Sequence, residues 1–166
     1  NSRLAESYRA EGIAYYSEKA YPEAIAAFSR SLNNMDDPDK EFKKDVQFYL
    51  AQARMDYGEV DKAIEVYSEI LKAGEDEQAF FLRGKAYISM EDYKNAEKDF
   101  QRALEGCEDY NLYINIYQIY VDHNKAVDGD AYLKMALELE PQDGEDCYHR
   151  GRIYEYEKNY EAARDE

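Results

Sequence analysis

Residues 77–109, EQAFFLRGKAYISMEDYKNAEKDFQRALEGCED, decide the fold of this chain. Apolar or small residues recur at helical spacing in both halves of the stretch: Phe80, Gly84 and Tyr87 in the first, and Ala96, Phe100, Ala103 and Leu104 in the second. Each set marks one face of a helix. The residues at 90–93, between the two sets, are mostly polar and favour a tight turn followed by a new helix start. The stretch therefore predicts a helical hairpin.

The same spacing occurs near the beginning of the chain. The first set there is Tyr8, Gly12 and Tyr15, and the second set is Ala24, Phe28 and Leu32. Pro22 falls in the first turn of the second predicted helix, where its missing N–H costs nothing. Because one hairpin cannot bury its apolar faces alone, the recurrence predicts a stack of similar hairpins.

Another unit lies between these two, and the connection before it is the longest in the chain. Its marker residues are Leu50, Ala51 and Ala53, then Gly58 at the turn, then Ala63, Ile64 and Tyr67. Ala24 and Ala63, which hold equivalent positions in successive units, are 39 residues apart, whereas Ala63 and Ala96 are 33 residues apart. Asp37 followed by Pro38 fits an N-cap and a first helical position. We therefore expect the surplus residues to lengthen the next helix, which ends at about Tyr57.

A fourth unit and part of a fifth complete the series. Their marker residues are Tyr113, Tyr117, Tyr120, Gly129, Leu133, Ala136 and Leu137 in the fourth, and Gly151, Tyr154, Tyr160 and Ala163 in the fifth. Gly129 stands where the earlier units carry alanine, and either small residue lets the two helices of a hairpin approach closely. The sequence stops within the last predicted helix. We expect either that the chain continues or that another molecule covers this end.

Charge and composition restrict the partners. The 37 acidic residues outnumber the 21 basic ones, and the net charge of -16 opposes binding to nucleic acid and to anionic lipid. No apolar run approaches the roughly 20 residues that span a bilayer, so we expect no membrane insertion by this segment. The first residue is Asn1 rather than Met, which leaves room for an upstream signal or anchor. A cytoplasmic and an envelope-anchored location both stay open.

No residue pattern specifies catalysis, a metal or a cofactor. Cys107 and Cys147 match no metal or redox spacing and are expected to be small buried hydrophobes. His123 and His149 lack a His or Cys one helical turn away, so we expect no metal site. The sequence also lacks a Gly-rich phosphate loop and the GxSxG and HExxH motifs. We therefore expect no enzymatic activity and no cofactor.

These recurring residues resemble the tetratricopeptide repeat, a helix-turn-helix unit of about 34 residues. The resemblance covers the chain as a single domain, with repeats at 5–36, 38–74, 77–109 and 110–143 and an incomplete repeat at 144–166. It is weaker in the second repeat, where Arg54 takes the place of Tyr15 and Tyr87. The resemblance implies an all-α fold, an α-solenoid built as a right-handed superhelix of antiparallel helix-turn-helix repeats.

The resemblance also implies a concave face, lined by the first helix of each repeat, that holds an extended peptide or a helix of a partner. The family's groove positions correspond here to a first row of Arg9, Phe48, Phe81, Ile114 and Tyr148, a second row of Ile13, Gln52, Lys85, Gln118 and Arg152, and, one turn farther, Met55 and Ile88. Lys85 and Arg152 are the expected donors to carboxylates of a peptide that also has hydrophobic anchors.

Some chaperone-binding members of the family hold a C-terminal carboxylate in this groove. The corresponding places are Ile13, Tyr49, Gln78 and Leu82, and apart from Gln78 they do not donate as that clamp requires. We expect no such clamp.

Two interpretations of the aromatic residues stay open. In one they line the partner-binding face, and in the other they pack between adjacent hairpins. Most of the 18 tyrosines fall on repeat positions and are expected to be structural. Four others are candidate anchors for a partner: Tyr16, Tyr49, Tyr148 and Tyr156.

The sequence thus favours a non-enzymatic protein–protein interaction scaffold that binds a protein or peptide in its concave groove. Two alternatives stay open. One is a self-assembling structural module, and hence a homo-oligomer, that docks through its incomplete last repeat. The other is an accessory domain of a larger protein that extends beyond Glu166.

Overall fold

The computed structural model describes residues 2–35 and 39–158, which form helices joined by short connections. In chain order the helices are α1 (Ser2–Ser17), α2 (Tyr21–Asn33), α3 (Lys40–Tyr57), α4 (Val60–Ala73), α5 (Glu77–Ser89), α6 (Tyr93–Ala103), α7 (Tyr110–Asp122), α8 (Ala126–Leu137) and α9 (Gly144–Tyr156). The described residues contain no strand. The all-α class predicted from the sequence is confirmed.

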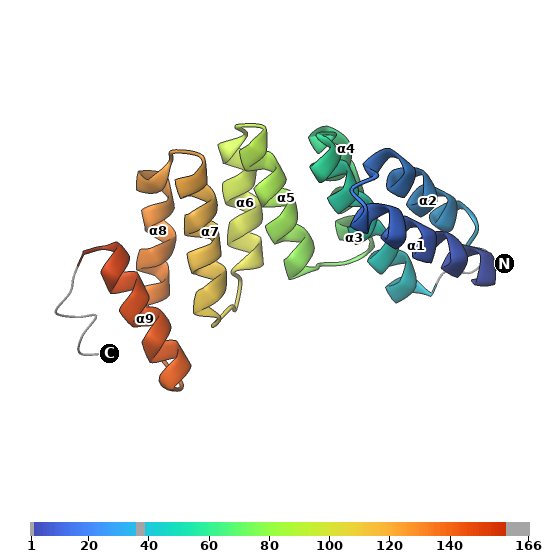
Figure 1. Ribbon diagram of the computed structural model, residues 1–166. Coiled ribbons are helices and arrows are strands. Elements are labelled where there is room, and N and C mark those ends of the chain that lie inside the picture. The colour runs from blue at the N-terminus through green and yellow to red at the C-terminus, as the bar shows by residue number, and fades with distance from the viewer. Residues whose placement is uncertain (1, 36–38, 159–166) are drawn as a thin grey trace. The chain divides into compact units, whose positions relative to one another are not determined.

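The chain divides into two compact units, Asn1–Asp99 and Phe100–Glu166, and the boundary falls within α6. Each unit is described by itself. Unit 1 contains α1 to α5 and α6 up to Asp99, and unit 2 contains the rest of α6 with α7 to α9. Figure 1 shows α1 with α2, α3 with α4, and α7 with α8 as antiparallel pairs. Each pair coincides with one of the predicted hairpins.

The first helix of each pair ends on the same kind of backbone turn. A residue with positive φ follows each of the helices α1, α3, α5, α7 and α9. These residues are Lys19 (59°), Gly58 (91°), Glu91 (59°), Asn124 (58°) and Lys158 (59°). In the first four places the next N–H donates to a carbonyl five residues back, from Ala20 to Tyr15, Glu59 to Arg54, Asp92 to Tyr87 and Lys125 to Tyr120. These bonds are the mark of the Schellman motif. The slot that Tyr15, Arg54 and Tyr87 share in the sequence therefore supplies the carbonyl that closes the helix.

Glycine permits the close approach of the two helices within a hairpin. A Cβ on Gly12 would lie 2.5 Å from the Phe28 ring, and a Cβ on Gly129 would lie 2.8 Å from the Cβ of Tyr120. The prediction that small residues are needed at the crossing is confirmed at Gly129. Pro22 lies in the first turn of α2, also as predicted.

The start of α3 differs from the prediction. This helix has 18 residues and ends at Tyr57, as expected. It begins at Lys40, however, and its N-cap is Asp39, whose carboxylate accepts from the N–H of Glu41 at 3.0 Å. Four residues used in the sequence analysis lie outside the described residues: Asp37, Pro38, Tyr160 and Ala163.

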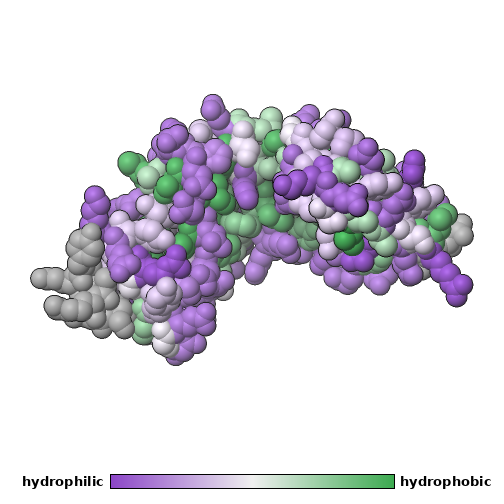
Figure 2. Space-filling model, viewed as in Figure 1, coloured by the Kyte–Doolittle hydropathy of each residue, from purple (hydrophilic) through white to green (hydrophobic). Residues whose placement is uncertain are grey.

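Large rings fill the space between the helices of each unit. Among the described residues of unit 1, one buried cluster consists of Ala24, Phe28, Val46, Leu50 and Ala53, and another consists of Ala51, Ala63, Tyr67, Ile70 and Ala79. In unit 2, the fully buried ring of Phe100 lies 6.1 Å from the ring of Tyr120 and 6.0 Å from that of Tyr132. Hydrophilic residues cover much of the face shown in Figure 2, with apolar side chains exposed between them.

Candidate partner-binding surface

Arg9, a predicted groove residue on α1, is tied to α3 by several contacts. Its Nε donates to Oδ2 of Asp45 at 2.5 Å. Its guanidinium lies 5.8 Å from the ring centroid of Phe42 and 5.6 Å from that of Tyr49. Tyr49 in turn stacks on Phe28 of α2, with centroids 5.5 Å apart. Arg9 and Tyr49 therefore hold the first hairpin against α3, and the sequence analysis missed Asp45 as the partner of Arg9.

Several predicted groove residues of unit 1 pack on its core. Phe48 and Met55 lie against the second buried cluster, and the ring of Phe48 is 6.3 Å from that of Tyr67. Phe81 is half-buried. Ile88 is fully buried, so its side chain is not accessible to a partner in this structure. Phe48 and Met55 therefore pack on the core of unit 1, and burial removes Ile88 from the accessible surface.

Gln52 belongs to a polar network at the ends of α1 and α3. Its Nε2 donates to Oδ1 of Asp56 at 3.0 Å, and the hydroxyl of Tyr16 donates to Oδ2 of the same carboxylate. Burial, helped by the hydrogen bond to Asp56, raises the pKa of Tyr16 to about 12. Burial also raises the pKa of Tyr67 above its usual value. Tyr16 is thus kept in the neutral form that donates to Asp56.

Lys85 of α5 is the exposed cation of unit 1 that the sequence analysis placed in the groove. Its ammonium forms no ion pair with any residue that the structure describes. The arginines nearby differ, because Arg54 pairs with Glu59 at 3.0 Å and Arg83 pairs with Asp99 at 2.7 Å. Lys85 therefore presents a free charge to solvent.

Gln118 and Ile114, the two predicted groove residues on α7, are less available to a partner than Lys85. Gln118 repeats the arrangement of Gln52, since its Nε2 donates to Oδ1 of Asp122 at 2.8 Å. Ile114 is only 5% exposed and is not accessible to a partner. The Gln–Asp pair at i and i+4, present at equivalent places in both units, is a signal in the sequence that could have predicted these bonds.

Three side chains form a row on α9. Tyr148, Arg152 and Tyr156 follow one another at intervals of four residues, and Tyr148 and Tyr156 are 63% and 39% exposed. The Cζ of Arg152 lies 6.0 Å from the ring centroid of Tyr148 and 5.9 Å from that of Tyr156. Its Nη2 lies 3.0 Å from the hydroxyl of Tyr156 and donates to it. We call these three residues the α9 row.

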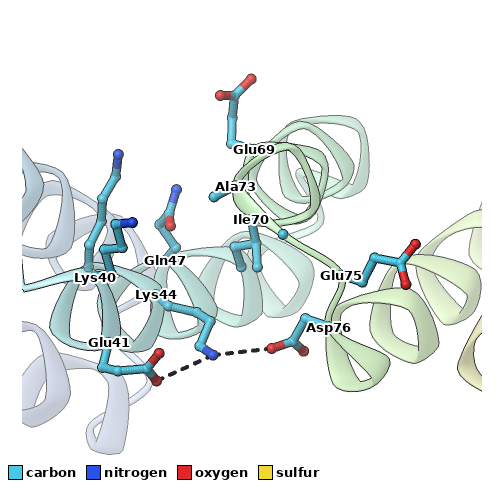
Figure 3. A pocket seen from close by; sticks show the side chains of 11 residues that line it. Lys40, Glu41, Lys44, Gln47, Glu69, Ile70, Ala73, Glu75 and Asp76 are labelled. Carbon is cyan, nitrogen blue, oxygen red and sulfur yellow. Dashed lines mark ion pairs between the residues drawn. The ribbon is translucent and has the colours of Figure 1, made fainter.

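A pocket of about 530 Å³ lies in unit 1 and is lined by residues of α3, of α4 and of the connection before α5. Figure 3 shows the Lys44 side chain directed between two carboxylates, at 3.3 Å from Glu41 and 3.4 Å from Asp76. These hydrogen bonds raise the pKa of Lys44, with Glu41 the larger cause. Both charge signs line the pocket, and Ile70 adds an apolar contact. The pocket contains none of the residues assigned to partner binding.

The histidine and cysteine side chains are the remaining candidates for chemistry. His149 is 7% exposed, and its Nε2 lies 3.0 Å from Nδ2 of Asn111. The thiols of Cys107 and Cys147 are half-buried, so the prediction that they are buried is wrong. Among residues 2–35 and 39–158, no three His, Cys, Asp or Glu side chains are placed to hold a metal ion. No described helix combines the length and apolarity needed to cross a bilayer.

Comparison with known proteins connects this arrangement to a repeat family. Residues 77–109 match the family model described as the tetratricopeptide repeat. This is the stretch from which the hairpin was predicted. A search of curated proteins gave no significant match.

Solved structures share the fold over almost the whole chain. A crystal structure of MamA protein is 16% identical with a TM-score of 0.65, and the match covers 99% of this chain and 88% of that one. MamA 41-end from Desulfovibrio magneticus RS-1 is 16% identical with a TM-score of 0.65, covering 98% and 90%. BtubC from P. vanneervenii is 17% identical with a TM-score of 0.63, covering 99% and 77%. At these identities the likeness concerns the fold, and it confirms the predicted α-solenoid.

Proposed function

We propose that this chain, which has an α-solenoid fold and matches the tetratricopeptide repeat at residues 77–109, is a non-enzymatic scaffold that binds a peptide or helix of a partner protein along the first helices of its repeats. A protein–protein interaction role is supported by the repeat family and the fold. The groove-binding mode is our proposal.

The proposal rests on one observation: two cationic side chains on first helices form no ion pair with the described residues. Lys85 on α5 and Arg152 on α9 form no ion pair with any described residue, although acidic residues are abundant in this chain. Arg9, Arg54 and Arg83, in contrast, each pair with a carboxylate of the same chain. A cation left unpaired in an acidic protein is available to a carboxylate of a partner.

The surroundings of these cations support a protein partner. Tyr148 offers a largely exposed ring, and aromatic side chains are common anchors in interfaces because they add contact area at small entropic cost. The net charge of -16 disfavours a polyanionic partner such as nucleic acid. Since Ile88 and Ile114 are buried, we leave them out of the proposed surface.

The test is the loss of binding on charge reversal. A partner is first isolated by affinity purification and then produced pure, so that its affinity can be measured by calorimetry. Lys85→Glu and Arg152→Glu should each weaken binding about tenfold or more, because a charge-assisted hydrogen bond is replaced by repulsion. Lys94→Glu on α6 is the matched control, since Lys94 is also exposed but lies on a second helix. If the double variant with both Lys85→Glu and Arg152→Glu bound the partner as tightly as the wild type, the proposed groove-binding mode would be wrong.

Self-assembly through the last repeat is the alternative of a different class. Light scattering over a concentration series measures it directly. A mass that stays that of a monomer at the highest concentration would exclude self-assembly, whereas a rise with concentration would favour it. The possibility of an accessory domain stays a prediction that the full-length gene would test.

A further inference from the structure

The guanidinium of Arg152 is held in a fixed place by the two tyrosines of the α9 row. The rings of Tyr148 and Tyr156 flank it at 6.0 Å and 5.9 Å, one helical turn before and one turn after. The hydrogen bond from Nη2 to the hydroxyl of Tyr156 fixes the orientation of the group as well as its position. Less side-chain entropy is therefore lost when a ligand binds Arg152.

Tyr117 of α7 supports the row from the neighbouring first helix. Its ring centroid lies 5.5 Å from that of Tyr156, with the rings tilted by 49°. Both helices belong to unit 2 and contact each other there. The candidate subsite is thus built from two helices, with Arg152 at its centre.

The hydrogen-bonding capacity of Arg152 is mostly unused. A guanidinium has five N–H donors, and the one hydrogen bond found for it within residues 2–35 and 39–158 is the bond to Tyr156. Glu155 follows Arg152 along α9 but forms no ion pair with it. Because the fork of a guanidinium matches a carboxylate in geometry, a carboxylate is the occupant that fits these donors.

We infer that the α9 row, together with Tyr117, is a subsite for a Glu or Asp side chain of a partner peptide, followed or preceded by an apolar residue that packs on the exposed ring of Tyr148. The inference rests on the proposed function and names the partner's chemistry at this place. The carboxylate accepts from the free N–H groups of Arg152. The apolar neighbour covers the ring of Tyr148, which is 63% exposed.

The charges of α9 favour one carboxylate over a polyanion. Glu145, Asp146 and Glu155 lie on the same helix as Arg152, and Glu145 is exposed. A strand of phosphates would meet repulsion from these groups, whereas a single carboxylate needs only the one guanidinium. The occupant is therefore an acidic segment of a protein.

The experiment selects peptides and then locates their contact. The wild-type chain is used to select binders from a display library of random peptides, and the enriched sequences are made with both ends blocked. Blocked ends ensure that the carboxylate belongs to a side chain. Enriched peptides should carry Glu or Asp beside an apolar or aromatic residue. Binding is measured by fluorescence anisotropy, and the Nε–Hε signal of Arg152 is followed by NMR.

Matched changes on both molecules test the contact. Arg152→Gln should weaken binding about tenfold or more, and Glu→Gln in the peptide should do the same. The two changes combined should cost little more than either alone, because they remove one interaction. Arg152→Lys should lie between wild type and Arg152→Gln, since lysine keeps the charge but not the fork. Lys134→Gln is the control, because it removes an equal charge from α8.

The outcomes separate this inference from the proposed function. Enriched peptides that bind Arg152→Gln as tightly as wild type, or that lack acidic residues, would overturn the subsite and leave the scaffold function intact. Failure to enrich any peptide would contradict the scaffold function and the subsite together. Thermal melting of each variant shows that it is folded, and variants at these partly exposed positions should melt with the wild type.

Discussion

Arg83 of α5 and Asp99 of α6 form a two-point ion pair across the third hairpin. The Nε of Arg83 donates to Oδ2 at 2.7 Å and its Nη2 donates to Oδ1 at 2.8 Å. The remaining Nη1 donates to the hydroxyl of Ser68 on α4 at 3.0 Å. The carboxylate of Asp99 raises the pKa of Arg83. One guanidinium therefore joins three helices of unit 1, at a place where Asp99 is buried.

Removing one partner of this pair should destabilise the protein strongly. Asp99→Ala leaves a largely buried guanidinium without its counter-charge and should lower the free energy of unfolding by about 3 kcal/mol or more. Replacing both partners by apolar residues, as in Arg83→Met with Asp99→Leu, should cost less than the single change. Urea denaturation measures both. Glu69→Ala, which breaks an exposed pair with Lys72, is the control and should cost less than about 1 kcal/mol.

Gly12→Ala should lower stability by about 1 to 3 kcal/mol, although alanine favours a helix over glycine. The new Cβ would lie 2.5 Å from Cε1 of Phe28, so the ring or the helix must shift. Gly74→Ala is the control, because no atom lies within 4 Å of a Cβ at Gly74. Thermal melting of the two variants checks the difference. If both variants melted alike, the close crossing of α1 and α2 would not be a packing constraint.

Glu91→Gly should raise stability by about 0.5 to 1 kcal/mol. Glu91 closes α5 with φ of 59°, a conformation that costs an L-residue more than it costs glycine. The equivalent Gly58 already has this conformation without the strain. Lys98→Gly, at an exposed position in the middle of α6, provides the contrast, because glycine in a helix interior should cost about 1 kcal/mol. A loss of stability in Glu91→Gly would show that the Glu91 side chain outweighs the backbone strain.

Tyr16→Phe should change how stability depends on alkaline pH. The folded-state pKa of Tyr16, about 12, lies above the ordinary value of 10.0, so the unfolded chain ionises first as pH rises. The stability that Tyr16 contributes is therefore complete below pH 10 and is lost between pH 10 and 12. Wild type should be the more stable protein below pH 10, and the gap to Tyr16→Phe should close near pH 12.

Denaturation of both proteins across this range measures that gap. Tyr67, whose pKa is also raised, is present in both and cancels in the comparison. A gap that stayed constant up to pH 12 would show that the pKa of Tyr16 is the same in the folded and unfolded chains.

Local sequence was sufficient for features that depend on neighbours along the chain. Pro22 marked the first turn of α2, and Gly58 marked the end of α3, because each residue restricts or permits its own backbone angles. The N-cap of α3 is an instructive failure. The segment before the helix contains several aspartates, each suited to an N-cap, and the choice of Asp39 over Asp37 does not follow from residue type.

The predicted binding surface depended more on the tertiary structure. The resemblance to the repeat family assigned Arg9, Ile88 and Arg152 to groove positions on three first helices. The fold gave them different roles, because Arg9 pairs with Asp45, Ile88 is buried, and Arg152 is flanked by tyrosines. Periodicity defines a face of a helix, but what covers that face depends on side chains from other helices.

The sequence by itself thus determined the repeat, its hairpins and its turns, since these follow from spacing and backbone preference within about 34 residues. The tertiary structure decided which charged and aromatic side chains make contacts within the fold and which stay accessible. Arg83 pairs with Asp99, and Arg9 pairs with Asp45 at a distance of 36 positions in the sequence, because helix packing brings these residues together. Arg152 pairs with no carboxylate among the described residues, and for that physical reason we propose it as a residue that binds a partner.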